Sequence, residues 1–572
     1  MQTVSQDYRN SMKSPLRNRG YIRVSMGLIN KDAQDSAYIS NEQGNYFSNS
    51  TKVFRGNENP KVYVTMENNH SKVDGSMYFP WKPSQGGYTY YNGFVSVGLA
   101  PCDVVITLSG SQNFKGLMID FGENYPTKFD IITNNTTLNI PSNTQALYKT
   151  DKSFTGINKV TLKIHQMKNP NTRVRIFSMK FGMGLEYGNE SVLDSSLDTC
   201  VSPISAELPQ IDFTVKIKNE NGSFDVENPE SMVNFIESEQ DMEVEYGYQL
   251  DNGNIEWVYG SNLKCGNWSS NDRELTLEAH DILRDKNAEH VDGECLTNGS
   301  TTYSVLATRV LKEMGITDYY IDPSLSNLET HNPIPRVSSK EALQLIANAG
   351  MCTLSITRRG RVELRKYDTQ LENFTIEKSD ILNAPNITKS DTIRKIILSY
   401  YNYVPTTDVT SLISEKVTVN HTDRVSYYFD EPYYDYTVTG ITDYSIIKAR
   451  AYYLEVEYRT TGTHEIEITG KKYNKVEKRV SRTINEKGVD INWSNPLIDN
   501  SSHANLLAAW LALYYKDQFQ YEYETRGNPE LDTMDVITQQ NDYISGMKVR
   551  VTRHVIKFKQ SFRGKLVTRR LR

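Results

Sequence analysis

The feature that most constrains the fold is a short-range alternation of apolar and polar residues that recurs along the chain. In residues 210–218, Phe213, Val215 and Ile217 lie on one side of an extended chain, and Thr214 and Lys216 lie on the other. This two-residue period is the pattern of a strand with one buried face. The 37 tyrosines, against 18 phenylalanines and 5 tryptophans, also suit half-buried strands. We therefore expect a mainly β fold.

The order of the alternating segments predicts a sandwich inserted in a barrel. At roughly 150 residues per domain, the 572 residues correspond to three or four domains. Residues 62–187 carry strands at a spacing of roughly ten residues, with no convincing helix, which is typical of a β-sandwich. Strands near 19–29 and within 210–282, with a hairpin turn at 251–253, flank this segment. We expect residues 1–60 and 190–295 to form one discontinuous β-barrel around a sandwich at 62–187.

The second half of the chain is predicted to be a small α/β module followed by a second β-barrel. Residues 301–315 have apolar residues at helical spacing, and Ser338 with Glu341 forms a capping box for another helix. A hairpin that turns at Arg359 and Gly360 completes a module at 296–372. Alternating segments at 392–404, 416–420, 452–458 and 464–473 assign 373–572 to the second barrel. One helix at 501–518 interrupts it, with the core-facing stripe Leu506, Ala509, Trp510 and Leu513.

Composition and motifs exclude several classes of protein. The net charge of -6 and the pI of about 6.0 argue against broad non-specific nucleic-acid binding, which needs a basic surface. The five cysteines, at 102, 200, 265, 295 and 352, are far apart and form no CxxC, so we expect neither a disulfide framework nor a zinc site. The nine histidines form no HExxH, and the chain has no GxSxG, phosphate-binding or dinucleotide-binding motif. We expect no catalytic residue, no metal and no cofactor.

Targeting and membrane signals are also missing from the sequence pattern. Residues 1–23 have no apolar core of the kind that a signal peptide needs. The longest apolar run, near 506–515, is about half of the ~20 residues that a membrane span requires. We therefore expect synthesis in a cytoplasm and no membrane span.

A Gly-rich loop in the predicted sandwich gathers four aromatic side chains. Trp81, Tyr88, Tyr90 and Tyr91 lie in the segment WKPSQGGYTYYNG. Aromatic faces on such a loop stack on sugar rings, and they equally line a protein interface or the edge of the domain's own core. Contact with a glycan is therefore one of three interpretations of this loop.

Two other stretches have a structural and a functional interpretation. The loop NENGSFDVE (219–227) is rich in oxygen ligands but lacks the order of a calcium-binding loop, so a turn held by side-chain to backbone hydrogen bonds is the simpler interpretation. From residue 550 onward, cations alternate with apolar residues and form either the solvated face of a hairpin or a patch that meets passing DNA or an acidic neighbour. These cations are Arg550, Arg553, Lys557, Lys559, Arg563, Lys565, Arg569, Arg570 and Arg572.

Two motifs and the inserted segment carry a resemblance to a known family. The first motif is a strand, a polar loop, a short helix and a second strand, and its matching residues are Phe224, Asp225, Asn228, Pro229, Val244, Tyr246 and Gly247. The second is a turn and strand at 526–537, matched by Arg526, Pro529, Leu531, Asp535 and Ile537. In these residues the chain resembles bacteriophage tail-hub or baseplate-hub proteins, that is, tail-tip proteins of the prophage endopeptidase type without the lytic domain. The stretches GLMIDFGENYPTKFDI and RVRIFSMKFGMGLEY resemble a galactose-binding-like sandwich.

The resemblance implies a structural protein of the virion tail. Two tube-like barrels per chain, repeated threefold, would make a pseudo-sixfold ring that continues a sixfold tail tube. The expected partners are two further copies of the chain, the tail tube, the distal tail ring, the tape measure protein and a spike or fibre, with DNA passing through the lumen. The expected location is the tail tip or baseplate of the virion, after synthesis in the host cytoplasm. The resemblance also implies ring or lumen contacts for Asp225, Asn228, Arg526, Arg563 and Arg569.

Two other functions remain open from the sequence. The first is a receptor-binding tail protein whose inserted sandwich holds a host cell-wall glycan through the aromatic loop. The second is a cell-wall hydrolase. We expect no enzyme, because the sequence ends at Arg572, directly after the second predicted barrel, where related tail proteins carry a lytic domain.

Overall fold

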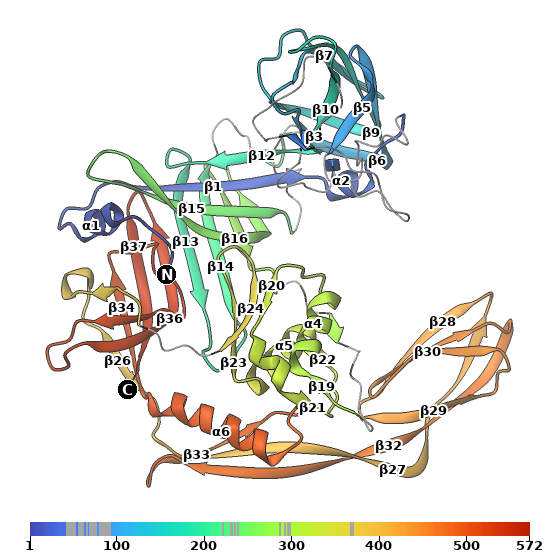
Figure 1. Ribbon diagram of the computed structural model, residues 1–572, viewed down its shortest axis with the longest axis vertical. Coiled ribbons are helices and arrows are strands. Elements are labelled where there is room, and N and C mark those ends of the chain that lie inside the picture. Colours follow the sequence, from blue (N-terminus) through green and yellow to red (C-terminus); the bar gives the residue numbers. More distant parts are fainter. Residues whose placement is uncertain are drawn as a thin grey trace.

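The computed structural model describes residues 1–41, 53–54, 62–63, 67, 77–78, 93–219, 222, 224–228, 231, 233, 236, 239–284, 286, 288–290, 293, 299–366 and 371–571. Strands dominate this part of the chain, and a few helices lie beside them (Figure 1). The expected mainly β fold with a small α/β module is confirmed.

One large sheet forms the centre of the molecule. Its first half-sheet is ordered β12 (Gly182–Tyr187), β1 (Gly20–Ile29), β15 (Asp241–Gln249), β16 (Ile255–Ser270), β17 (Glu274–His280), β14 (Gln210–Lys218) and β13 (Val192–Cys200). Its second half-sheet continues with β36 (Met547–Phe558), β37 (Phe562–Arg570), β34 (Phe519–Thr525) and β26 (Asn386–Lys389), and β35 (Val536–Gln539) pairs with both β36 and β25 (Thr375–Ile376). The strands of both predicted barrels thus belong to the same sheet.

The two half-sheets meet where β13 pairs antiparallel with β36. The register runs from Ser195 opposite Phe558 to Cys200 opposite Arg553. On β14 every second residue is buried, so the alternation in the sequence marks the inner face correctly. Apolar contact also crosses the junction, because the ring of Phe562 on β37 lies 5.7 Å from that of Tyr246 on β15. The half-sheets are therefore joined by backbone pairing and by packing.

The inserted segment forms separate sheets with a core of its own. Its main sheet contains β11 (Ser178–Lys180), β6 (Cys102–Asp120), β9 (Leu147–Met167), β7 (Pro126–Thr133), β8 (Thr137–Ile140) and β2 (Tyr38–Ile39). The pair β5 (Phe94–Leu99) and β10 (Arg173–Ile176) and the pair β3 (Val62–Tyr63) and β4 (Met77–Tyr78) accompany it. Figure 1 shows this unit at one end of the molecule, reached through β1 and β12.

The insertion begins earlier in the chain than the predicted residue 62. The helix α2 (Lys31–Ser36) and strand β2 already pack in its core, where Ala33 and Ile39 are buried with Phe114 and Leu162. Residues 31–39 therefore do not belong to the first barrel, to which the sequence pattern assigned them. The entry and exit of the unit are adjacent, since Ile29 at the end of β1 pairs with Gly182 at the start of β12.

The α/β module lies beside the first half-sheet. Its helices are α4 (Tyr303–Glu313) and α5 (Ser339–Ala349), and its sheet contains β20 (Tyr319–Ile321), β24 (Val362–Lys366) and β23 (Cys352–Ile356). Short pairs join β18 (Glu289–His290) to β22 (Val337–Ser338) and β19 (Thr301–Thr302) to β21 (Glu329–Thr330), and η3 (Pro323–Asn327) is a single 3-10 turn. The predicted capping box of Ser338 and Glu341 is present, and Gly360 makes the hairpin turn with a φ of +82°.

The segment 393–494, predicted as part of the second barrel, builds a long arm instead. The strands β27 (Ile393–Val419) and β32 (Gly462–Thr483) pair along their length, flanked by β29 (Tyr433–Thr439) and β33 (Val489–Ser494). A second sheet of β28 (Asp423–Tyr428), β31 (Tyr453–Tyr458) and β30 (Tyr444–Arg450) packs at the far end around Leu454, Val456 and Ile468. The residues around it, in η4 (Lys378–Asp380), β25, β26 and β34 to β37, lie in or beside the second half-sheet.

The helix α6 (Ser501–Lys516) lies along the base of the arm (Figure 1). Its predicted apolar stripe is only partly correct, because Ala509 and Trp510 are half-buried and Trp510 packs against the core, whereas the two leucines of the stripe do not. Leu506 and Leu513, predicted to face the core, are 53% and 61% exposed. Leu507 and Leu511 are buried instead. Because this helix has apolar residues around most of its circumference, its periodicity does not select one face.

The helix α1 (Gln6–Lys13) precedes β1 and contacts the turn between β34 and β35, where Arg9 donates to Glu530. None of the helices in the described ranges is long and apolar enough to cross a membrane.

Candidate functional site

The turn that follows β34 is enclosed by other parts of the chain. Gly527 takes a φ of +70°, and a Cβ at this position would lie 2.8 Å from the carbonyl carbon of Arg563, so the backbones approach closely here. Arg17, which follows α1, donates from Nη1 to the carbonyls of Arg526 and Gly527, both at 2.6 Å. In return Arg526 donates from Nη2 to the carbonyl of Ser14 at 2.8 Å. These reciprocal bonds fix the N-terminal segment on the turn.

Arg358 fastens the same turn to the first half-sheet from the other side. It comes from the β23–β24 hairpin, is 6% exposed, and donates to the carbonyls of Tyr259 at 2.8 Å and Pro529 at 2.7 Å. It also donates to the carbonyl of Leu531 and lies 3.4 Å from the Asp532 carboxylate. One side chain therefore joins the α/β module, β16 and the turn.

Three titratable groups are buried beside this turn. Burial raises the pKa of Glu530, whose carboxylate accepts from Nε of Arg9 at 2.6 Å. Burial also raises the pKa of Asp535 to about 6. Burial and the nearby Arg358 charge lower the pKa of His554 to about 4, and its Nδ1 donates to the Leu531 carbonyl at 3.0 Å. The imidazole is therefore neutral at pH 7, and its contact fixes the turn.

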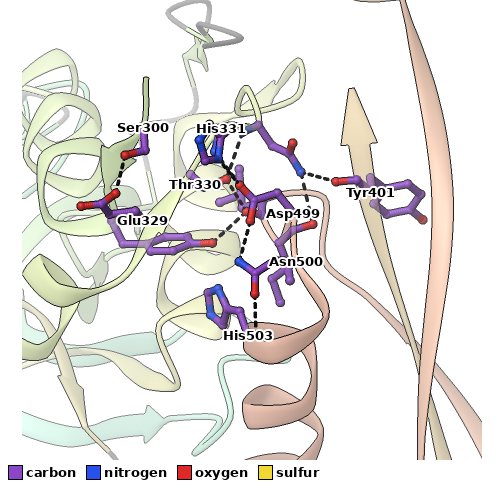
Figure 2. Close-up of polar contacts among 12 residues, drawn as sticks. Ser300, Glu329, Thr330, His331, Tyr401, Asp499, Asn500 and His503 are labelled. Atoms are coloured by element: carbon purple, nitrogen blue, oxygen red, sulfur yellow. Dashed lines mark hydrogen bonds and ion pairs between the residues drawn. The ribbon is translucent and has the colours of Figure 1, made fainter. Parts of the chain in front are cut away.

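A second polar cluster joins the α/β module to the base of the arm, as Figure 2 shows. The hydroxyls of Thr330 and Tyr303 donate to the carbonyl of Leu497 at 2.6 and 2.8 Å. The amide of Asn332 donates to the carbonyls of Tyr401 at 2.7 Å and of Pro496 and Ile498 at 2.9 and 3.2 Å. These bonds occupy the backbone carbonyls just before α6 and one carbonyl on β27.

The start of α6 completes this cluster (Figure 2). Asp499 accepts from the backbone amide of His331 at 2.8 Å and from its Nδ1 at 2.6 Å. Asn500 caps the helix by accepting from the backbone amide of His503 at 2.8 Å. Nε2 of His503 lies 2.8 Å from the carbonyl of Ala349, and burial lowers the pKa of this imidazole, so the ring is neutral and donates.

The pair of His331 and Asp499 has the geometry of the base and orienting carboxylate of a nucleophilic hydrolase. Such a site also needs a hydroxyl within hydrogen-bond reach of the imidazole. Two hydroxyls drawn in Figure 2 have other acceptors, because Ser300 donates to the carboxylate of Glu329 and Thr330 donates to the Leu497 carbonyl. The bonds between His331 and Asp499 join the α/β module to the start of α6.

The polar loop predicted as a ring contact is bonded within itself. Asp225 is exposed and accepts from the backbone amide of Glu227 at 3.1 Å. Asn228 donates to the carbonyl of Gly222 at 3.1 Å, and Phe224 is buried against Tyr187. These contacts are those of a stabilised turn. The ring-contact role of Asp225 and Asn228 stays a prediction.

The three arginines predicted to face the ring or lumen lie in different surroundings. Arg526 bonds to the N-terminal segment, as described above. The guanidinium of Arg569 lies 3.8 Å from the ring centroid of Tyr514 and donates to its hydroxyl at 2.9 Å, so it holds α6 on β37. Arg563 is exposed at the tip of the β36–β37 hairpin. A lumen contact is sterically simplest for Arg563, and for all three it stays a prediction.

The remaining expectations concern sugars and metals. Trp81, Tyr88, Tyr90 and Tyr91 lie outside the described residues. Across the described ranges, no group of three or more His, Cys, Asp or Glu residues could hold a metal ion. Sequence reasoning missed Arg358, His331 and Asp499, because single residues of these types carry no motif; the predicted hairpin turn beside Arg358 was the only local signal.

Comparison with known proteins gives structural likeness only. No family model and no curated protein matches the chain. The chain is similar to the 43 kDa tail protein of prophage MuSo2 from Shewanella oneidensis, with 9% identity over 77% of this chain and 97% of the other, and a TM-score of 0.37. It is also similar to a tail protein from Neisseria meningitidis MC58 (10% identity, 67% and 93% covered, TM-score 0.39) and to prophage tail protein gp18 from Listeria monocytogenes EGD-e (11% identity, 67% and 91% covered, TM-score 0.31). The names agree with the resemblance in the sequence, but at TM-scores below 0.5 we base no functional argument on them.

Proposed function

We propose that this protein is the structural hub of the tail tip or baseplate of a phage or phage-like particle, where three copies close the tail tube. The observation that carries the proposal is the pairing of two β half-sheets side by side through β13 and β36. The two family motifs lie one in each half, at 224–247 and 526–537. Three chains with two such halves each make a ring of six similar parts, which matches a sixfold tube.

The fastenings described above support an architectural role. A ring part must keep its two halves in one mutual orientation while neighbouring proteins pull on it. Arg358 and the bonds of Arg17 and Arg526 supply this rigidity with charge-assisted hydrogen bonds that are partly or fully buried. The outlying insertion and arm leave two separate units for contacts with the distal tail ring, the tape measure protein, and a spike or fibre (Figure 1).

We further propose that the protein performs no bond chemistry and that DNA passes it without binding. With a net charge of -6 the chain as a whole repels the phosphate backbone of DNA, as expected for a protein that DNA passes without binding. Two hydroxyls drawn with the His331–Asp499 pair in Figure 2 have other acceptors, Glu329 and the Leu497 carbonyl. A role as scaffold accounts for both observations.

The mass of the purified full-length chain in solution tests the hub proposal. We expect native mass spectrometry to show a species of three times the 65.4 kDa chain mass, and image averaging to show a threefold ring with six similar sectors. A protein that stays monomeric, alone and with tail-tube protein, contradicts the proposal. A zymogram on host cell wall tests the second part, since a cleared zone would show a hydrolase.

A further inference from the structure

A pocket of about 150 Å³ lies against the turn described above, between α1, β25 and the segment that follows β34. One wall is the face of α1 that carries Arg9, Met12 and Lys13, and the opposite wall includes Phe374 and Ile376. Leu531 and Leu566 also line the pocket. Four of these apolar side chains, Met12, Ile376, Leu531 and Leu566, are at most 3% exposed, and polar side chains such as Asn373, Thr525 and Asn528 line the rest, so the pocket combines an apolar part with a polar one.

Two guanidinium groups at this pocket bond only to neutral acceptors. Arg17 donates to the carbonyls of Met12, Arg526 and Gly527, and Arg526 donates to those of Ser14 and Pro15. Within the described ranges, neither arginine has a carboxylate at ion-pair distance. Burial, followed by the positive charge of Arg526, lowers the pKa of Arg17 to about 10. The Asp380 carboxylate acts on Arg17 only from beyond ion-pair distance and raises the pKa of Arg17 less than burial and Arg526 lower it.

The acidic residues of the pocket do not neutralise it. Glu530 is paired with Arg9, at 2.6 Å from Nε. Asp380 is the second carboxylate of the lining, and its Oδ2 accepts from the backbone amide of Glu377 at 3.2 Å. Against it stand Lys13, Arg17 and Arg526, so the pocket keeps an excess of positive charge.

We propose that this pocket binds a carboxylate whose apolar part is about the size of a benzene ring. A cavity of about 150 Å³ has room for a benzene ring, and guanidinium groups bind carboxylates through paired hydrogen bonds. An inorganic anion would meet the charge but leave the apolar wall unfilled. The same chemistry is offered by a free aryl or branched-alkyl acid and by the C-terminal residue of a peptide that ends in Phe or Leu.

Calorimetric titration of the full-length protein with phenylacetate tests the inference. We expect phenylacetate to bind with a dissociation constant below ~1 mM. Benzyl alcohol, which lacks the charge, should bind at least ~10-fold more weakly, and inorganic phosphate, which lacks the ring, should compete equally weakly. A short peptide ending in Phe distinguishes a free acid from a peptide C-terminus as the ligand. If the peptide binds more tightly than phenylacetate, and C-terminal amidation abolishes its binding, the site binds a chain terminus. If phenylacetate binds more tightly than the peptide, the site binds a free acid.

Charge variants separate this pocket from general surface attraction. Asp380→Asn keeps a side-chain oxygen that can accept from the backbone amide of Glu377 but removes a negative charge from the pocket. We therefore expect it to bind phenylacetate about 3- to 10-fold more tightly. Lys13→Glu should weaken binding by a similar factor or more. The matched control is Lys378→Glu, an exposed lysine close to Asp380 in sequence but outside the lining, with less than ~2-fold effect expected.

Three results would overturn the inference: no heat of binding at 10 mM phenylacetate, phosphate competing as well as phenylacetate, or equal effects of Lys13→Glu and Lys378→Glu. Thermal denaturation of each variant establishes that it is folded. Because Asp380→Asn predicts a gain of binding, its result cannot be produced by a damaged fold. The inference does not depend on the hub proposal, since a monomer would serve equally well in the titration.

Discussion

Replacing Arg358 by methionine removes the side chain that joins three parts of the molecule. The residue is 6% exposed and donates to the carbonyls of Tyr259, Pro529 and Leu531. A hydrogen bond to a charged group contributes about 1.5–3 kcal/mol, and buried carbonyls left without a donor cost more. Allowing for partial relaxation of the turn, we expect a loss of about 3–5 kcal/mol in the free energy of unfolding of the unit that contains it.

Calorimetry measures this loss of stability, and hydrogen exchange shows which segments it affects. The first thermal transition should fall by roughly 6–20 °C, taking about 2–4 °C per kcal/mol for a unit of this size. Exchange at the backbone amides of residues 526–535 and 255–262 should accelerate together, because Arg358 connects these two segments.

Arg359→Met is the matched control on the same hairpin. Arg359 is exposed, and its guanidinium lies 5.1 Å from the ring centroid of Tyr259, a contact that contributes about 0.5–1 kcal/mol. If Arg358→Met costs less than about 1 kcal/mol, or no more than Arg359→Met, the role given to Arg358 is wrong.

Four further outcomes are expected. His554→Gln should make the stability of the protein less sensitive to acid. The buried imidazole has a pKa of about 4 against ~6.5 in the unfolded chain, so the unfolded state takes up the proton first and the free energy of unfolding falls as pH drops from 6.5 towards 4. Urea midpoints at pH 7 and pH 5 should show this loss, about 2 kcal/mol, in the unchanged protein and a smaller one in the variant. Asp535 opposes this change in the same measurement, because its raised pKa of about 6 makes the folded state bind the proton first between pH 6 and 4, so Asp535→Asn should steepen the loss of stability on acidification. On α6, Leu511→Ala should cost about 2–5 kcal/mol in urea unfolding and Leu513→Ala within about 0.5 kcal/mol; equal costs would contradict the assigned buried face. Replacing residues 30–181 with Asn-Gly should leave a chain that folds with a similar melting temperature, since Ile29 and Gly182 are paired and a two-residue loop closes such a pair; an insoluble product would show that the insertion supports the core.

Strands and caps could be predicted because their signals are local. The alternation of Phe213, Val215 and Ile217 depends only on the two-residue period of an extended chain, and all three side chains are buried. The capping box of Ser338 and Glu341 is likewise settled within four residues. Such features need no knowledge of what the element packs against.

Features that depend on distant partners could not be predicted in this way. The segments 392–404 and 416–420 have separate alternating patterns, yet β27 runs through both, because β32 pairs along the whole length. The apolar circumference of α6 left its buried face undecided until β27 and β32 covered Leu507 and Leu511. Arg358 and Arg359 are equivalent in sequence, and only the position of the turn at 526–535 buries the first.

The pairing of β13 with β36 also has a consequence for the timing of synthesis. The edge of β13 stays uncovered on the ribosome until the residues up to Phe558 have been made. At about 5–20 residues per second, the roughly 350 residues between the two strands take about 20–70 s to translate. During that interval a nascent chain carries an unpaired strand edge that neighbouring polysomal chains could capture. Because β36 is made so late, the edge of β13 needs to be covered during translation, by a chaperone or by rapid docking of the α/β module.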